Sequence, residues 1–324
     1  MKTWTFCSCL AMPINNFINL RRLSGTDYHS QAQMLGYFDR FLIEQKLSAP
    51  PLTHEITDRY QQSLSRLAPR SQSNRFCVVR QLCEYLARTD PFSYVPDPLR
   101  TPSLRAVHQP YIYSLSLVHA LLATASDLSP SGSLRPHTYR TLLELLYSTG
   151  IRIGEAFALK REDFYADEQR LYIAEGKFRK ARWIALSATA CRALQRYNDR
   201  RRHSTPCSPN SPLFLNERGR RLCHTTVHQT FQRLLQHNGI TGDRHSGPRI
   251  HDLRHTFAVH RLLAWYRDGQ DVNARLPALA TYMGHVNVSS THVYLRPTAE
   301  LRGEVHKRFH NYYLQNLNPH GEKL

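Results

Sequence analysis

The stretch RIHDLRHTFAVH, residues 249–260, has the residue spacing of a helix with one polar, cationic face. His251, Arg254 and His255 stand at positions i, i+3 and i+4, so a helix would place them side by side. The apolar face of the same helix would carry Leu253 and Phe257. Three such polar groups together indicate that something negatively charged lies opposite them.

The composition narrows the choice of that negative partner. The chain has 324 residues, enough for two domains, and its hydrophobic content of 41% is compatible with globular folding. A formal charge of +18 points to a polyanion, either nucleic acid or an anionic membrane surface. We find no apolar run of about eighteen residues, so we expect a soluble protein without a membrane span.

Cysteine usage and the N-terminal residues bear on location. The seven cysteines form no C-x-x-C pair, which favours reduced thiols in the cytoplasm over disulfides or a zinc site. The segment MKTWTFCSCLAMP is the only candidate for a targeting signal. An extension upstream of a start at Met12 is the alternative, and we set residues 1–20 apart as an N-terminal extension.

The next part of the chain has the pattern of a small helical bundle. Apolar residues recur at three- and four-residue spacing in QMLGYFDRFLIEQ, TDRYQQSLSRL and NRFCVVRQLCEYLAR, with Thr57 and Asn74 as expected helix starts. Five prolines follow in residues 89–110 without a sustained period. The sequence therefore predicts a helical domain over residues 21–95 and a linker over 96–110.

A second domain is expected over residues 111–310, followed by a tail over 311–324. Helices are predicted in SLSLVHALLATASDL and in PHTYRTLLELLYSTG, which Gly150 would end, and again from about Thr225. The alternation in RLYIAEGKFRKARWIALS predicts a short antiparallel hairpin between them. The fold class is thus mainly α with a small antiparallel β-hairpin. No glycine-rich phosphate loop is present, so we expect no ATP or NAD cofactor.

Individual motifs leave two interpretations open. Arg152 stands where one helix has ended and another begins, so its guanidinium and the new helix N–H groups could face one anion, or it could be a surface arginine. Lys177 begins a basic turn that could reach a scissile phosphate or could simply be solvated. His251 and His255 have the spacing of zinc ligands, but no third ligand stands out, and an oxyanion-binding face fits better. His285 and Tyr294 could be functional or core residues.

The order of these motifs, however, is specific. TGIRIGEAFAL, a lysine in a hairpin, HDLRHTFA, MGH and a tyrosine nine residues later together resemble the tyrosine recombinase, or phage integrase, family. The catalytic motifs of that family fall on six residues here: Arg152, Lys177, His251, Arg254, His285 and Tyr294. The resemblance covers about residues 111–310, and the N-terminal bundle is similar to the family's core-binding domain in position, size and helicity. The link over residues 264–282 is longer than in compact members, which could alter contacts to DNA or to a neighbouring subunit.

The resemblance implies a chemistry for each of these residues. Tyr294 would attack a DNA phosphate and form a 3′-phosphotyrosine link, while Arg152 and Arg254 hold the non-bridging oxygens. Lys177 would protonate the leaving 5′-oxygen, and His251 would accept the tyrosine proton. His285 would hydrogen-bond the phosphate, whereas the role of His255 stays open. Further basic residues of the hairpin are candidates for binding DNA: Arg179, Lys180 and Arg182.

The resemblance also implies partners and a setting. We expect double-stranded DNA as the substrate, a homo-oligomer of four protomers, accessory recombinases in some reactions, and no metal or other cofactor. The setting would be the bacterial cytoplasm or nucleoid, with the gene on a mobile element. A type IB topoisomerase-like enzyme and a non-catalytic DNA-binding regulator are the alternatives. The other tyrosines near the motifs, Tyr282, Tyr312 and Tyr313, are expected to serve packing.

Overall fold

The computed structural model describes most of the chain in two compact units. The described residues are 4–47, 51–99, 110–174, 181–202, 208–241, 247–284, 303, 304 and 306. The first unit comprises residues 1–108 and the second residues 109–324. Each unit has a hydrophobic core of its own.

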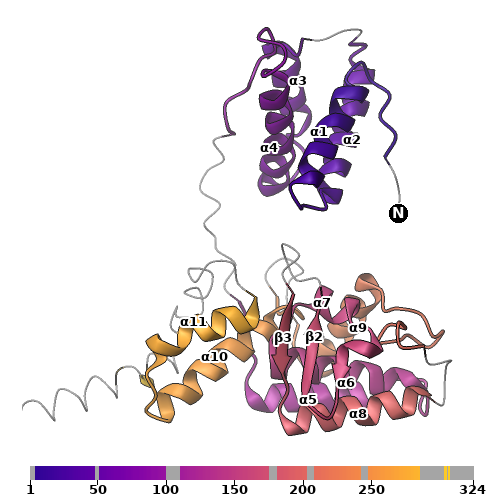
Figure 1. The fold of residues 1–324 in the computed structure, drawn as a ribbon, viewed down its shortest axis with the longest axis vertical. Coiled ribbons are helices and arrows are strands. Elements are labelled where there is room, and N and C mark those ends of the chain that lie inside the picture. Colours follow the sequence, from indigo (N-terminus) through magenta and orange to yellow (C-terminus); the bar gives the residue numbers. More distant parts are fainter. Residues whose placement is uncertain are drawn as a thin grey trace, which may run out of the picture. The chain divides into compact units, whose positions relative to one another are not determined.

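The first unit is a helical bundle (Figure 1). Its helices are α1 (Ala11–Leu23), α2 (His29–Glu44), α3 (His54–Ser63) and α4 (Pro69–Leu86). The core residues recur at helical spacing, as in Leu35, Phe38 and Leu42 of α2, all of which are fully buried. The bundle predicted from the apolar spacing is therefore present in the structure.

The bundle begins earlier in the chain than the sequence led us to expect. Phe6 and Leu10 are buried in its core, and α1 continues that apolar pattern. The backbone N–H groups of Cys7 and Ser8 donate to the buried carboxylate of Asp39, at 2.9 and 3.0 Å. Residues 4–20 thus belong to the folded bundle, and setting them apart as an extension was wrong.

Two helix starts also differ from the prediction. Helix α3 begins at His54 rather than Thr57, because the Thr53 hydroxyl caps it by accepting the Ile56 N–H. Helix α4 begins at Pro69 rather than Asn74. Proline suits the first helical turn, where its missing N–H costs no hydrogen bond, and this signal outweighed the asparagine.

The start of the expected linker packs on the first unit. Val95 and Leu99 lie against its hydrophobic core, and the Arg80 Nε donates to the Pro96 carbonyl oxygen at 2.9 Å. Residues 100–109 lie outside the described part of the chain.

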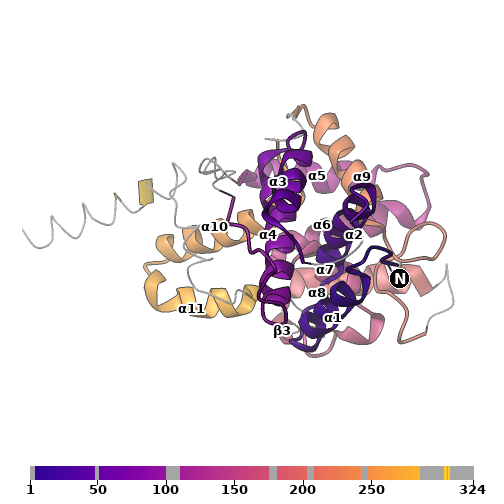
Figure 2. The ribbon, with the colours of Figure 1, turned by 90° about the horizontal axis from the view of Figure 1, so that it is seen from above.

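The second unit combines helices with one small sheet (Figures 1 and 2). In chain order it contains α5 (Leu115–Ser126), α6 (Leu134–Thr149), α7 (Ile153–Ala158), the 3₁₀ turn η1 (Arg161–Asp163), β1 (Phe164–Tyr165), β2 (Arg170–Ile173), β3 (Arg182–Ala185), α8 (Ala188–Arg202), α9 (His224–His237), α10 (Asp252–Arg267) and α11 (Val272–Met283). Its mainly helical character with a small antiparallel sheet confirms the predicted fold class.

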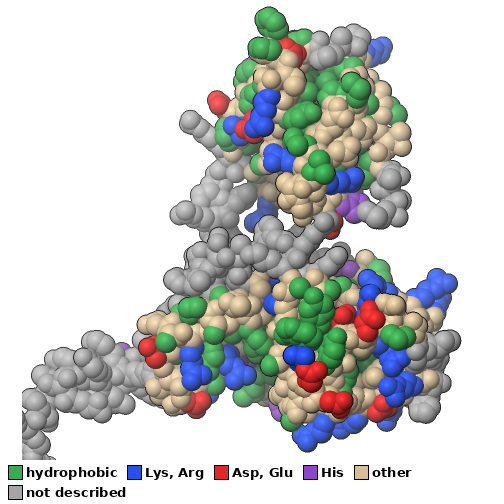
Figure 3. Space-filling view, in the orientation of Figure 1, with side chains coloured by type: hydrophobic (Ala, Val, Ile, Leu, Met, Phe, Trp, Pro, Cys, Tyr) green, Lys and Arg blue, Asp and Glu red, His purple; other side chains and the backbone are tan. Residues whose placement is uncertain are grey.

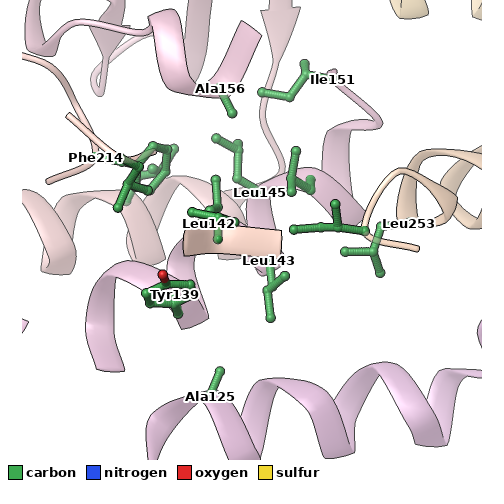
Figure 4. Close-up of a cluster of buried hydrophobic side chains, with 14 of the residues drawn as sticks. Ala125, Tyr139, Leu142, Leu143, Leu145, Ile151, Ala156, Phe214 and Leu253 are labelled. Atoms are coloured by element: carbon green, nitrogen blue, oxygen red, sulfur yellow. The ribbon is translucent and has the colours of Figure 1, made fainter. Parts of the chain in front are cut away.

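Helix α6 forms the centre of the second unit. It contacts α5, α8, α10 and α7, and four of its leucines are buried among them: Leu142, Leu143, Leu145 and Leu146. Figure 4 shows Leu142, Leu143 and Leu145 among residues of other elements, including Ile151 and Leu253. A helix packed against four other helices holds its C-terminal end in a fixed place, which matters because the next residues carry the site.

The sheet has the order β1-β2-β3 with antiparallel pairing throughout. In the β2–β3 pair Leu171 stands opposite Ile184, and both side chains are buried, whereas Tyr172 stands opposite Trp183 on the other face. The predicted hairpin strands are confirmed, and the residues between them that we expected to form the turn, 175–180, lie outside the described part of the chain.

The long link over residues 264–282 is mostly helix. It contains the end of α10, a turn at Gly269, and nearly all of α11. Figures 1 and 2 show α10 and α11 side by side, and Leu262, Leu276 and Leu279 share a small core between them. The link thus forms part of a packed helical pair.

The surface carries many basic groups. Figure 3 shows lysine and arginine side chains on the visible face of both units, with acidic and hydrophobic side chains among them. Among the described residues, no helix has the length and apolar character needed to cross a membrane.

Candidate active site

Arg152 is held at the junction between α6 and α7. Helix α6 ends at Gly150, which adopts a left-handed conformation (φ +63°), and its N–H donates to the Leu146 carbonyl oxygen. A Cβ at Gly150 would lie 2.4 Å from Cδ1 of Phe257, so α10 also approaches too closely for a side chain there. Arg152 follows as the N-cap of α7, as the glycine stop predicted.

The Arg152 side chain is oriented from two directions. Its Nη1 donates to Glu155 Oε1 at 2.8 Å, and its Nη2 donates to the Gly284 carbonyl oxygen at 2.8 Å. The Arg152 backbone N–H donates to Glu155 Oε2 at 2.9 Å. We expected the N–H groups at the start of α7 to face a bound anion together with the guanidinium. The N–H of Arg152 instead binds the carboxylate of Glu155 in its own helix. The side chain remains 22% exposed.

Arg254 lies in the first turn of α10 and is almost fully buried. Its Nη1 donates to the Gly150 carbonyl oxygen at 2.5 Å, and its Nη2 donates to the Met283 carbonyl oxygen at 2.7 Å. These oxygens belong to the C-terminal ends of α6 and α11, where the helix dipole is negative and favours a cation. The two helix ends therefore fix the guanidinium in place.

The two histidines of α10 lie together, as their spacing predicted. The rings of His251 and His255 are 5.3 Å apart at an interplanar angle of 83°. His251 keeps an exposed edge, yet the protein atoms around its ring desolvate it. This desolvation, followed by the nearby charges of Arg254, Arg152 and Arg249, lowers the pKa of His251 to about 4. His251 is consequently neutral at neutral pH and able to accept a proton.

Glu155 joins two arginines and was missed from the sequence. Arg182 donates from Nη1 to Oε1 at 3.1 Å and from Nη2 to Oε2 at 2.8 Å, on the same carboxylate that Arg152 binds. Burial opposes ionisation of Glu155, but the hydrogen bonds from Arg182 and Arg152 outweigh it, so the pKa of this carboxyl lies below its ordinary value. Its position three residues after a helix N-cap, where acidic residues close a capping box, was the available signal.

Arg182 is placed differently from a surface contact to DNA. Its side chain is 12% exposed, and its Nε donates to the Tyr282 carbonyl oxygen at 3.0 Å. Together with the two bonds to Glu155, this directs Nε, Nη1 and Nη2 of Arg182 at protein oxygens. The geometry favours a supporting role over the DNA contact that we expected.

The described site thus brings together Arg152, Arg182, Arg254, Glu155 and His251. Three guanidinium groups and one carboxylate leave an excess of positive charge beside a neutral imidazole, an arrangement suited to an oxyanion. Some of the predicted site residues lie outside the described part of the chain: Lys177, Arg179, Lys180, His285 and Tyr294. Tyr312 and Tyr313 are outside it as well, whereas Tyr282 is partly buried and donates to the Ala185 carbonyl oxygen at 2.9 Å.

Known proteins resemble this chain over most of its length. Residues 117–300 match the phage integrase family. A protein of Sinorhizobium fredii named integrase/recombinase y4rB is 35% identical over 307 residues, covering 93% of this chain and 97% of that protein. The tyrosine recombinase XerC of Pelobacter propionicus is 30% identical over 264 residues, covering 81% of each chain.

A solved structure has a similar fold. The integrase of the transposon Tn1549, in complex with transposon right end DNA, superposes with a TM-score of 0.62 at 18% identity, covering 92% of this chain and 99% of that one. The chain therefore belongs to the phage integrase family and is a tyrosine site-specific recombinase.

Proposed function

We propose that this recombinase cuts and rejoins double-stranded DNA through a covalent 3′-phosphotyrosine intermediate, with Tyr294 as the nucleophile. The observation that carries the proposal is the convergence of Arg152 and Arg254 at the ends of α6 and α11, with His251 near enough for both charges to lower its pKa. The order of the remaining motifs in the sequence supports it, because Tyr294 follows the Gly-His pair at the spacing typical of the family.

The arginines would bind the phosphate under attack. A guanidinium has five N–H donors in a planar fork, and Arg152 and Arg254 are each oriented by carbonyl oxygens. Donors that are oriented before the reaction stabilise charge that develops in the transition state without further rearrangement. The non-bridging oxygens of the phosphate, which gain negative charge during attack, are the groups that such donors would hold.

Proton transfer requires two further residues. The bond from Tyr294 to phosphorus forms as the bond from phosphorus to the 5′-oxygen breaks; the phenol proton goes to His251, and Lys177 gives a proton to the leaving oxygen. His251 is neutral before DNA binds, so it is ready to accept. The negative charge of a bound phosphate would counter the arginines that lower the pKa of His251, and would make it a stronger base. His285 would add a hydrogen bond to the phosphate.

The net charge of the chain and its membership of the phage integrase family support a proposal for the substrate and the assembly. A net charge of +18 suits a polyanionic duplex, and two units on one chain suit binding of DNA by both. We propose that the protein acts as a tetramer on two DNA sites, with or without accessory recombinases. The relative named integrase/recombinase and the transposon integrase of similar fold support a mobile-element setting.

A covalent-trapping experiment tests the mechanism. The DNA bound by the Tyr294→Phe protein is recovered and sequenced, and a labelled duplex of that sequence is incubated with the unaltered protein. We expect a protein–DNA adduct that survives denaturation, formed without divalent ions, and no adduct with Tyr294→Phe. Tyr282→Phe is the control, because that tyrosine packs beside the site and should leave the adduct intact. An adduct on the Tyr294→Phe protein would refute the assignment.

A further inference from the structure

Arg182 connects three segments that lie far apart in the sequence. From β3 it donates two hydrogen bonds to Glu155 of α7 and one to the Tyr282 carbonyl oxygen in the last turn of α11. The Arg182 guanidinium also packs against the backbone of Gly284, where a Cβ would lie 2.8 Å from its Cζ. Arg182 and Gly284 are therefore fitted to each other, and the Gly284 carbonyl oxygen is the one that Arg152 binds.

Glu155 is shared between Arg182 and Arg152, and this sharing has an electrostatic consequence. Each carboxylate oxygen accepts one bond from each arginine. If Arg182 were absent, the carboxylate would face Arg152 alone and would neutralise it more completely. Arg152 would then present less positive charge to a phosphate and would be held more tightly toward Glu155.

We propose that Arg182 is a positioning residue for strand cleavage: it balances the charge of Glu155 and anchors the end of α11, so that Arg152 keeps its charge and orientation for the DNA phosphate. This inference rests on the function proposed above. A lysine could supply the charge but not the bidentate contact and the third bond together, because its ammonium is a single point of contact on a flexible stem.

The proposal predicts a pattern across four variants: Arg182→Gln, Arg182→Lys, Glu155→Gln, and the double variant Arg182→Gln/Glu155→Gln. Arg182→Gln should slow single-turnover adduct formation by roughly 10- to 100-fold, because a displacement of about 1 Å in a group that acts on the substrate can cost up to about 100-fold in rate. Arg182→Lys should lose less. Glu155→Gln in the Arg182→Gln background should recover part of the lost rate, because it removes the charge that Arg182 no longer balances. A residue needed only for folding would give the opposite result, since a second lesion would add to the first.

Two controls accompany these variants. Arg170→Gln changes an arginine of the neighbouring strand that pairs with Glu168 and stacks on Trp183, and adduct formation should stay within about twofold of the unaltered protein. Thermal unfolding and DNA affinity are measured for every variant. Arg182→Gln should retain most DNA affinity; a loss of affinity with a weaker salt dependence would make Arg182 a DNA contact and overturn the proposal.

A measurement without DNA separates this inference from the proposed function. The pKa of His251, followed by nuclear magnetic resonance, reports the net charge around the site. Arg182→Gln should raise it, and the added Glu155→Gln should bring it back down. A failure of the unaltered protein to form an adduct would refute the proposed function alone. Two results would refute the role of Arg182. One is an unchanged His251 pKa in Arg182→Gln. The other is a rate of adduct formation in Arg182→Gln/Glu155→Gln that is reduced by the combined effects of the two single substitutions.

Discussion

Replacing Gly150 with alanine tests how the end of α6 is fitted to the site. The left-handed conformation of Gly150 costs any other residue about 1–2 kcal/mol. The new Cβ would lie 2.4 Å from Cδ1 of the buried Phe257, and overpacking of this kind costs about 1–3 kcal/mol. We therefore expect Gly150→Ala to lower the free energy of unfolding by about 2–5 kcal/mol, a large share of the roughly 5–15 kcal/mol typical of a domain.

Gly154→Ala is a matched control four residues away. Gly154 lies in α7 without a left-handed conformation, and a Cβ there would meet nothing within 4 Å. Alanine at this position should be neutral or should stabilise the helix by up to about 1 kcal/mol. The assay is urea unfolding followed by circular dichroism, and hydrogen exchange of peptides from α6 and α10 assigns the loss to the second unit.

A second substitution separates the two causes. Phe257→Leu in the Gly150→Ala background should recover part of the overpacking cost, although the backbone strain would remain. Because the Gly150 carbonyl oxygen binds Arg254, the folded fraction of Gly150→Ala should also form the DNA adduct more slowly. Two results would contradict this prediction. One is a free energy of unfolding for Gly150→Ala within about 0.5 kcal/mol of that of the unaltered protein. The other is a double variant whose loss of stability equals the sum of the losses of Gly150→Ala and Phe257→Leu.

Three further predictions concern catalysis, pH and salt. Arg152→Ala and Arg254→Ala should each slow adduct formation by roughly two decades or more while gel-shift titration shows most DNA affinity retained; equal losses would contradict their role. The free energy of unfolding should fall as the pH drops from about 6.5 to about 4, because His251 is neutral in the folded protein and binds a proton on unfolding. His251→Gln should make the free energy of unfolding less dependent on pH in this range. DNA affinity should fall steeply between roughly 50 and 200 mM salt, and a flat response would exclude extensive phosphate contacts.

Local signals in the sequence were enough to predict most of the helices and strands, and to place Arg254 and the two histidines beside it. Gly150 ended α6 as its position indicated, and the i, i+3 and i+4 spacing placed Arg254 and the two histidines on the first turns of α10. The alternation around Leu171 and Ile184 correctly predicted the paired strands. In each case the pattern that decides the structure lies within one element, where periodicity is informative.

The parts that escaped prediction depend on contacts between distant residues. Arg182 in a basic hairpin looked like a DNA contact, and only the fold shows that Tyr282, a hundred residues later, and Glu155 occupy its donors. The segment with Phe6 and Leu10 shows little apolar pattern, because Ser8 and two cysteines separate these residues, yet both side chains are buried in the core of the first bundle. The spacing of residues within one helix or strand does not predict contacts between residues that are far apart in the sequence.

The link over residues 264–282 shows why the site and the fold cannot be considered separately. Its length suggested altered contacts to DNA or to a neighbouring subunit, but α11 brings three successive carbonyl oxygens, from Tyr282 to Gly284, to three arginines. A helix C-terminus holds unpaired carbonyl groups that need donors, and buried guanidinium groups need acceptors, so each satisfies the other. The same contacts that stabilise α11 against the rest of the unit therefore set the direction in which Arg152 and Arg254 present their charge. A change of helix length or register in α11 should for this reason affect cleavage even where it touches no residue that binds DNA.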